Sequence, residues 1–137
     1  MEDKINSDLL KKTEHKGTVL IVDDEETICT ITQLMLEKAG FEVLTALDGL
    51  DAIKAISDLN GKVDCILLDH SMPNMNGEET FEVMKSRFPH VRVVMMSGYS
   101  MKDVSVNYTE KDISGYIQKP YTQATLVHTI TQAISGK

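Results

Sequence analysis

The sequence contains no apolar run that approaches the roughly 18 residues needed to cross a membrane. Its N-terminal stretch, MEDKINSDLLKK, lacks the apolar core of a secretion signal. Cysteine is scarce too: Cys29 and Cys65 form no C-x-x-C pair and lie in apolar segments, which predicts buried free thiols rather than a disulfide. For a chain of 137 residues, we therefore expect one soluble domain located in the cytoplasm.

Glycine-rich phosphate-binding motifs are also absent, because neither G-x-G-x-x-G nor G-x-x-x-x-G-K occurs. This excludes the usual dinucleotide site and the P-loop. Positive charge is in short supply: the formal net charge is −7, and residues 1–16 hold equal numbers of acids and lysines. The remainder of the chain is therefore acidic, which argues against direct binding of nucleic acid.

Short apolar runs alternate with helical patterns along most of the chain. Residues 1–15 are polar and are expected to be a flexible lead or linker, before a single domain over residues 16–137. Strands are predicted at 18–22, 41–46, 63–68, 91–96 and 115–119. The pattern predicts an α/β fold, a doubly wound (βα)₅ unit with a five-stranded parallel sheet and helices on both faces.

The helices between these strands are predicted from apolar residues at helical spacing. Segment 100–112 is rich in Ser, Asn and Thr, so it is the weakest helix and the element expected to move. The predicted stripes are Ile28, Ile31, Leu34 and Met35; Ala52, Ile53, Ile56 and Leu59; Phe81, Met84 and Phe88; and Leu126, Val127, Ile130 and Ile134.

Residues that can do chemistry follow the predicted strands. Open parallel sheets bind ligands beyond the carboxyl ends of their strands, so these positions are the candidates for a site. They are Asp23, Asp24, Asp69, Ser97, Gly98, Lys119 and Pro120.

Three of these residues, Asp23, Asp24 and Asp69, are expected to converge from two neighbouring strands. Carboxylates so close repel one another unless a cation compensates, and oxygen ligands alone favour Mg²⁺. A solvated acidic loop is the alternative for Asp23 and Asp24. A bound cation would let Asp69 act as a nucleophile toward phosphorus, with Lys119 neutralising charge and the Ser97 hydroxyl donating to a phosphoryl oxygen.

Four motifs in order, LIVDDEE, ILLDHSMPNMNG, VVMMSG and GYIQKPY, resemble the receiver domain of two-component response regulators. The resemblance covers about residues 17–135. It implies a flavodoxin-like fold with strand order 2-1-3-4-5. It also implies a phosphorelay function, in which the domain catalyses its own phosphorylation from a kinase phosphohistidine and a slow autodephosphorylation.

The resemblance also assigns roles to individual residues. It implies that Asp69 is the phosphoacceptor, and that Mg²⁺ or Mn²⁺ is held by Asp24 and Asp69, by Asp23 through water and by the Ser71 carbonyl. It places Lys119, Ser97 and Gly98 at the phosphate and makes Ser97 and Tyr116 the switch pair. It also implies a cis peptide bond before Pro120, and it places Gly77 in the loop after the phosphorylated strand.

Two positions differ from the usual pattern of relatives. Ser71 is short and Tyr99 is bulky, and both are expected to flank the path of a water molecule toward the phosphate. We therefore expect Tyr99 to shield the acyl phosphate from hydrolysis.

The implied partners are proteins. A sensor histidine kinase or a phosphotransfer protein would supply the phosphoryl group. A downstream effector protein would read the surface formed by segment 100–112, the fifth strand and the last helix. The chain could be a separate regulator or the receiver of a hybrid sensor kinase.

Two other functions compete with this one. A phosphatase of the haloacid dehalogenase type needs a second acid two residues after its nucleophile, where Ser71 stands here. A receiver-like module that binds partners without phosphorylation is the other alternative.

Overall fold

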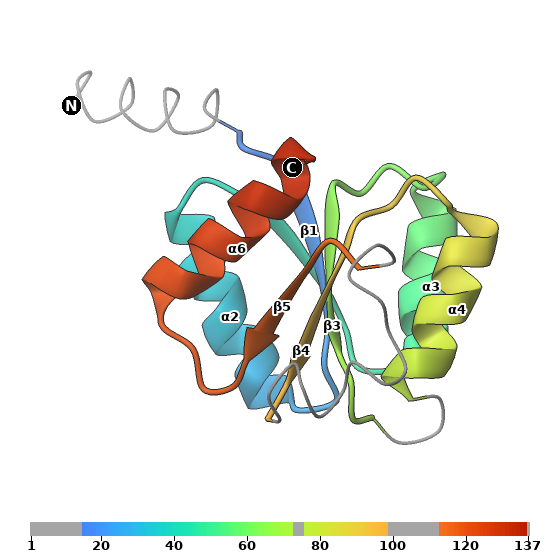
Figure 1. The fold of residues 1–137 in the computed structure, drawn as a ribbon, viewed down its shortest axis with the longest axis horizontal. Coiled ribbons are helices and arrows are strands. Elements are labelled where there is room, and N and C mark those ends of the chain that lie inside the picture. Colours follow the sequence, from blue (N-terminus) through green and yellow to red (C-terminus); the bar gives the residue numbers. More distant parts are fainter. Residues whose placement is uncertain (1–14, 73–75, 99–112, 137) are drawn as a thin grey trace.

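The computed structural model describes residues 15–72, 76–98 and 113–136, and these form a five-stranded parallel sheet flanked by helices (Figure 1). The expected lead before His15, Tyr99 and the predicted mobile segment 100–112 lie outside the described residues. The described elements are β1 (Thr18–Val22), α2 (Glu26–Lys38), β2 (Glu42–Ala46), α3 (Gly49–Asp58), β3 (Cys65–Asp69), α4 (Gly77–Arg87), β4 (Val93–Ser97), β5 (Gly115–Gln118) and α6 (Gln123–Ser135).

The strand order is β2-β1-β3-β4-β5, and every neighbouring pair is parallel. Helices α2 and α6 cover one face of the sheet, while α3 and α4 cover the other (Figure 1). This confirms the predicted doubly wound architecture and the strand order. All strands end at the same rim, which is the lower one in Figure 1, where the arrowhead of β5 points.

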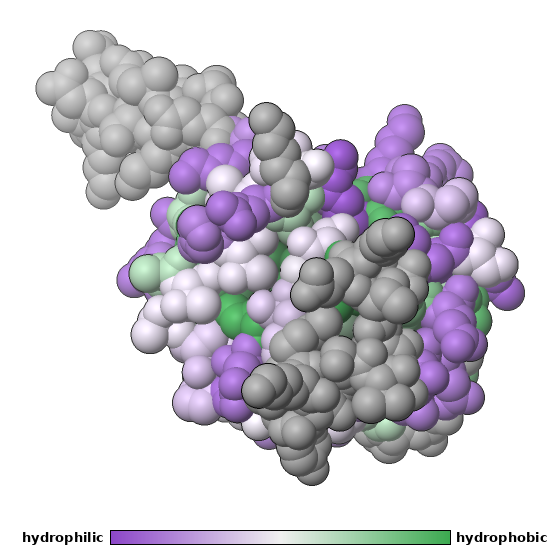
Figure 2. Space-filling view, in the orientation of Figure 1, coloured by the Kyte–Doolittle hydropathy of each residue, from purple (hydrophilic) through white to green (hydrophobic). Residues whose placement is uncertain are grey.

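Alternation along the strands divides the core into two clusters. Val19 and Ile21 of β1 face the α2 and α6 side, while Leu20 and Val22 face α3 and α4. Strands β3 and β4 are buried throughout, as expected for central strands, whereas β2 alternates and β5 is partly exposed at the two edges. In the view of Figure 2, hydrophobic residues are visible on the described surface only as small patches.

Only part of the predicted apolar stripe of α2 contacts the core: Met35 packs against the cluster on the α2 and α6 side. The residues that α2 buries are Cys29, Thr32 and Leu36. Ile31 and Leu34 are 46% and 55% exposed. Periodicity alone assigns the helix but cannot tell a stripe that packs on the sheet from one that faces outward. The stripes predicted for the other three described helices do contact the core.

Strands β3 and β4 begin two residues later and end one residue later than predicted, while β2 begins one residue later and β5 ends one residue earlier. Asp69 and Ser97 are the last residues of β3 and β4 rather than loop residues, and Asp69 pairs in register with Met96. Both cysteines are free and buried, as predicted. Within the described part of the chain, no helix is long and apolar enough to cross a membrane.

Candidate functional site

The register of the sheet places Asp23 and Asp69 side by side at the rim. Val22 of β1 pairs with Leu68 of β3, so the residue that follows each of them lies at the same level. The Asp23 amide continues the ladder by donating to the Ala46 carbonyl at 3.1 Å. The backbone therefore fixes the spacing of these two carboxylates before any side-chain contact is made.

Three carboxylates converge at this point, as the sequence predicted. One carboxylate oxygen from each of Asp23, Asp24 and Asp69 lies within 4.8 Å of the other two. Asp23 is 0% exposed and Asp69 is 4% exposed, while Asp24 faces the solvent. The cluster is thus sealed on one side and open on the other.

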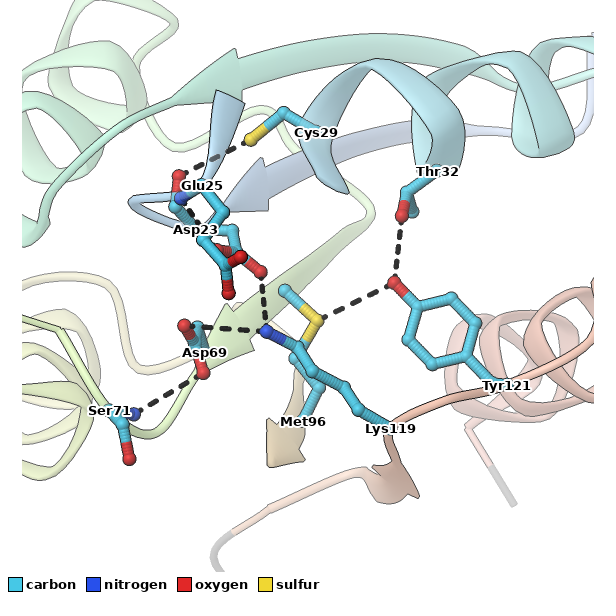
Figure 3. Close-up of polar contacts among 9 residues, drawn as sticks. All are labelled: Asp23, Glu25, Cys29, Thr32, Asp69, Ser71, Met96, Lys119 and Tyr121. Atoms are coloured by element: carbon cyan, nitrogen blue, oxygen red, sulfur yellow. Dashed lines mark hydrogen bonds and ion pairs between the residues drawn. The ribbon is translucent and has the colours of Figure 1, made fainter. Parts of the chain in front are cut away.

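Lys119 reaches into the cluster from the end of β5 (Figure 3). Its ammonium donates to Asp23 Oδ2 at 2.8 Å and lies 3.6 Å from Asp69 Oδ2. Burial alone would lower the pKa of Lys119, but the hydrogen bond to Asp23 and the charges of Asp69 and Asp23 outweigh it, and the net effect raises that pKa. Lys119 is therefore held in its charged form.

One cation does not compensate three carboxylates. Burial and the neighbouring charge of Asp23 raise the pKa of Asp69 to about 7 from its ordinary value of 3.8. A hard divalent cation coordinated by carboxylate oxygens would remove this repulsion. The donor set, all oxygen and open on the Asp24 side, fits Mg²⁺ or Mn²⁺.

The loop after β3 is held close to Asp69. The Ser71 amide donates to Asp69 Oδ1 at 3.3 Å, and the Gly77 amide donates to the His70 carbonyl at 3.0 Å. A Cβ at Gly77 would lie 2.6 Å from the Asp69 carbonyl oxygen and from the His70 Cα, so only glycine fits there. Asn76 caps α4 just before it, through a reciprocal capping box with Glu79.

Ser97 and Tyr116 lie on the same side of the sheet. Tyr116 pairs with Met95, and Ser97 stands two residues further along β4. Ser97 is buried, whereas Tyr116 is half-buried and packs against the core cluster on the α3 and α4 side. The Ser97 carbonyl accepts from the Lys119 amide at 2.7 Å, which ties β4 to the start of the next loop.

The chain turns sharply after Lys119. The Lys119–Pro120 peptide bond is cis, the geometry that the family resemblance implied. Gly98, the residue after β4, is exposed, and its carbonyl accepts from the Gln118 side chain at 3.4 Å.

The contacts that join α2 to Asp23 and to Tyr121 were not predicted from the sequence. The Tyr121 hydroxyl is hydrogen-bonded to the Thr32 hydroxyl at 2.7 Å and donates to the Met96 sulfur at 3.8 Å. The Cys29 thiol donates to the Asp23 carbonyl at 3.3 Å. Cys29, Thr32 and Leu36 form the buried face of α2, and no pattern in the sequence distinguished this face from the apolar stripe that contains Ile31 and Leu34.

Comparison with families of known proteins gives a match that covers most of the chain. The model of the response regulator receiver domain matches residues 19–131. Protein PilG of Pseudomonas aeruginosa is 32% identical over 82% of this chain and 83% of its own length. The CAI-1 autoinducer sensor kinase/phosphatase CqsS of Vibrio cholerae is 30% identical over 88% of this chain, and the chain spans only 18% of that relative.

Solved structures show the same similarity. A response regulator receiver domain protein from Clostridium thermocellum superposes with a TM-score of 0.81 at 28% identity, over 88% of this chain and 95% of that one. The chemotaxis protein CheY4 of Vibrio cholerae gives a TM-score of 0.77 at 28% identity, over 85% of this chain and 98% of that one. The chain also spans 13% of the sensor kinase CckA of Brucella abortus, so similar units occur both within long kinases and in proteins of about its own length.

Proposed function

Because the chain belongs to the response regulator receiver domain family of two-component systems, we propose that Asp69 is its phosphoacceptor. The phosphoryl group would come from the phosphohistidine of a sensor kinase or phosphotransfer protein. The observation that carries this assignment is the convergence of Asp23, Asp24 and Asp69 on one rim, with Lys119 between two of them. Asp69 is the carboxylate of this group that the loop after β3 also orients.

The residues of the rim have distinct tasks in this transfer. A carboxylate oxygen of Asp69 attacks phosphorus, the bond to the donor histidine nitrogen breaks, and an acyl phosphate results. Lys119 offsets negative charge on the transferred group, and Asp23 holds Lys119 in place beforehand. Bound Mg²⁺, held by Asp24, Asp69, the Ser71 carbonyl and, through water, Asp23, would supply the further positive charge that phosphoryl transfer requires.

Phosphorylation of Asp69 would be detected by partner proteins through Ser97 and Tyr116. The Ser97 hydroxyl would donate to a phosphoryl oxygen, and Tyr116 would turn inward on the same side of the sheet. The output surface then includes β5 and α6, together with segment 100–112. The phosphoryl group adds a charge of about −1.5 to −2, and this charge would shift the equilibrium between the two conformations of this surface.

The phosphodonor protein would dock over α2. This helix begins at the rim that carries Asp23 and leaves Ile31 and Leu34 exposed. Beside it lies an apolar hollow of about 230 Å³, which is lined by Ile28, Ile31, Thr32, Met35, Lys119, Pro120 and Tyr121. An apolar surface next to the phosphoacceptor suits a partner that must approach closely and then leave.

Intact mass after incubation with acetyl phosphate and Mg²⁺ tests this function. A single stable phosphoryl addition supports the receiver function. Rapid release of inorganic phosphate without accumulation would support an aspartate-nucleophile phosphatase, although Ser71 stands where that class needs an acid. No addition and no release would support an interaction module that acts without phosphorylation.

A further inference from the structure

The polar contacts between α2 and the loop after β5 have no part in the transfer described above. Thr32 is 2% exposed, and its hydroxyl is hydrogen-bonded to Tyr121 at 2.7 Å across 89 residues of sequence. A buried face of a helix rarely carries a hydroxyl without a specific partner. The contact therefore favours one orientation of α2 relative to the loop after β5.

Helix α2 is tied to both sides of the Asp23–Lys119 ion pair. Through Cys29, one turn before Thr32, it contacts the carbonyl of Asp23. Through Thr32 it contacts Tyr121, two residues after Lys119 (Figure 3). The same helix thus sets the position of the carboxylate and of the loop that supplies its ammonium partner.

The Tyr121 hydroxyl is also connected to the strand beside Asp69. It donates to the sulfur of Met96, and Met96 pairs in register with Asp69. The pKa of Tyr121 is raised because the ring is buried, with the hydrogen bond from Thr32 opposing this, so the hydroxyl stays protonated at neutral pH and can keep donating. Pro120 joins Tyr121 to Lys119, and its ring removes the φ rotation that would let the two residues move separately.

We propose that the hydroxyl pair of Thr32 and Tyr121 positions Lys119 between Asp23 and Asp69, and thereby sets the rate of phosphoryl transfer. Both are positioning residues, since neither reaches the reacting atoms and each acts through Lys119. The inference rests on the proposed function. A change in the seating of α2, including one caused by a docked phosphodonor, would be transmitted by this pair to the ammonium of Lys119.

The test compares the rates at which acetyl phosphate labels single and double variants at saturating Mg²⁺. Tyr121→Phe and Thr32→Val each remove one hydroxyl and keep the shape of the side chain. We expect each to slow labelling about three- to tenfold, the effect of losing one hydrogen bond. Thr32→Ser, which keeps the hydroxyl, should restore most of the rate, and Mg²⁺ affinity should stay within about twofold of wild type.

The background of Lys119→Ala separates positioning from general stabilisation. If the pair acts through Lys119, Tyr121→Phe should cause no further slowing there. Thr30→Val is the matched control, because Thr30 lies on the same helix and its hydroxyl donates to the Glu26 carbonyl of that helix.

Two kinds of negative result are distinguishable in this test. Wild-type rates in both Tyr121→Phe and Thr32→Val would overturn the inference, as would equal slowing of Tyr121→Phe with and without Lys119. Absence of labelling in the wild type would instead contradict the proposed function itself.

Discussion

The ammonium of Lys119 lies closer to Asp23 than to Asp69, at 2.8 Å against 3.6 Å. Lys119 is therefore bonded most tightly to the carboxylate that is not the proposed phosphoacceptor, and its contact with Asp69 is the longer one. A phosphoryl group on Asp69 would present new oxygens within reach of a small movement of this ammonium.

Replacing Lys119 by alanine should slow labelling at least tenfold, since a preorganised charge worth a few kcal/mol in the transition state is lost. Asp69 is retained, so labelling should remain measurable at high acetyl phosphate concentration. The matched control is Lys85→Ala, because the Lys85 ammonium donates to backbone carbonyls of Pro89 and Val91 rather than to the rim. Equal labelling rates in Lys119→Ala and the wild type would rule out a role of this charge in the transfer.

The stability of the metal-free protein should depend on pH through Asp69. Its pKa is about 7 in the folded protein against an ordinary value of 3.8, so the folded state binds a proton more tightly than the unfolded chain. Stability should therefore fall as pH rises through this window, whereas Asp69→Asn lacks the effect. Urea denaturation with EDTA should show the wild type losing about 1 to 3 kcal/mol relative to Asp69→Asn between about pH 4 and pH 8.

Added Mg²⁺ should reverse that loss in the wild type and leave Asp69→Asn less affected. A difference between the two proteins that stays constant over the whole pH range would show that the proton on Asp69 is not linked to folding.

Asp24 should be needed for metal binding but not for the fold, because it is the exposed member of the cluster. Wild type should be stabilised by about 2.7 kcal/mol when Mg²⁺ is present at a hundred times its dissociation constant. Asp24→Asn should lose most of this stabilisation and show a weaker binding isotherm in calorimetry. Glu26→Gln is the control, since Glu26 is also exposed, lies two residues away and is outside the cluster. An equal loss of the stabilisation by Mg²⁺ in both variants would point to a general effect of acidic charge.

Gly77→Ala should destabilise the protein by about 1 to 3 kcal/mol, because the new Cβ would meet backbone atoms of Asp69 and His70 at 2.6 Å. Gly98→Ala is the matched substitution, as no atom of the described residues lies within 4 Å of a Cβ built there. Thermal unfolding of the two variants should differ by several degrees. Similar melting temperatures would show that the loop after β3 can move away from Asp69 without cost.

The fold and the carboxylate cluster could be predicted from the sequence because both follow from regular patterns. Apolar runs mark central strands, and residues at the ends of parallel strands must share one rim. The buried face of α2 could not be predicted, because Ile31 and Leu34 form a stripe like that of a core helix while Cys29 and Thr32 occupy the real one. The Thr32–Tyr121 contact joins residues 89 positions apart, and no local pattern encodes such a distance.

The most direct test of the account is to locate the phosphoryl group. Borohydride reduces an aspartyl phosphate to homoserine, so protein labelled with acetyl phosphate and Mg²⁺ can be reduced, digested and sequenced by mass spectrometry. We predict homoserine at position 69 alone, and none when EDTA replaces Mg²⁺. Homoserine at position 23 or 24, or labelling that persists in Asp69→Asn, would contradict the central claim.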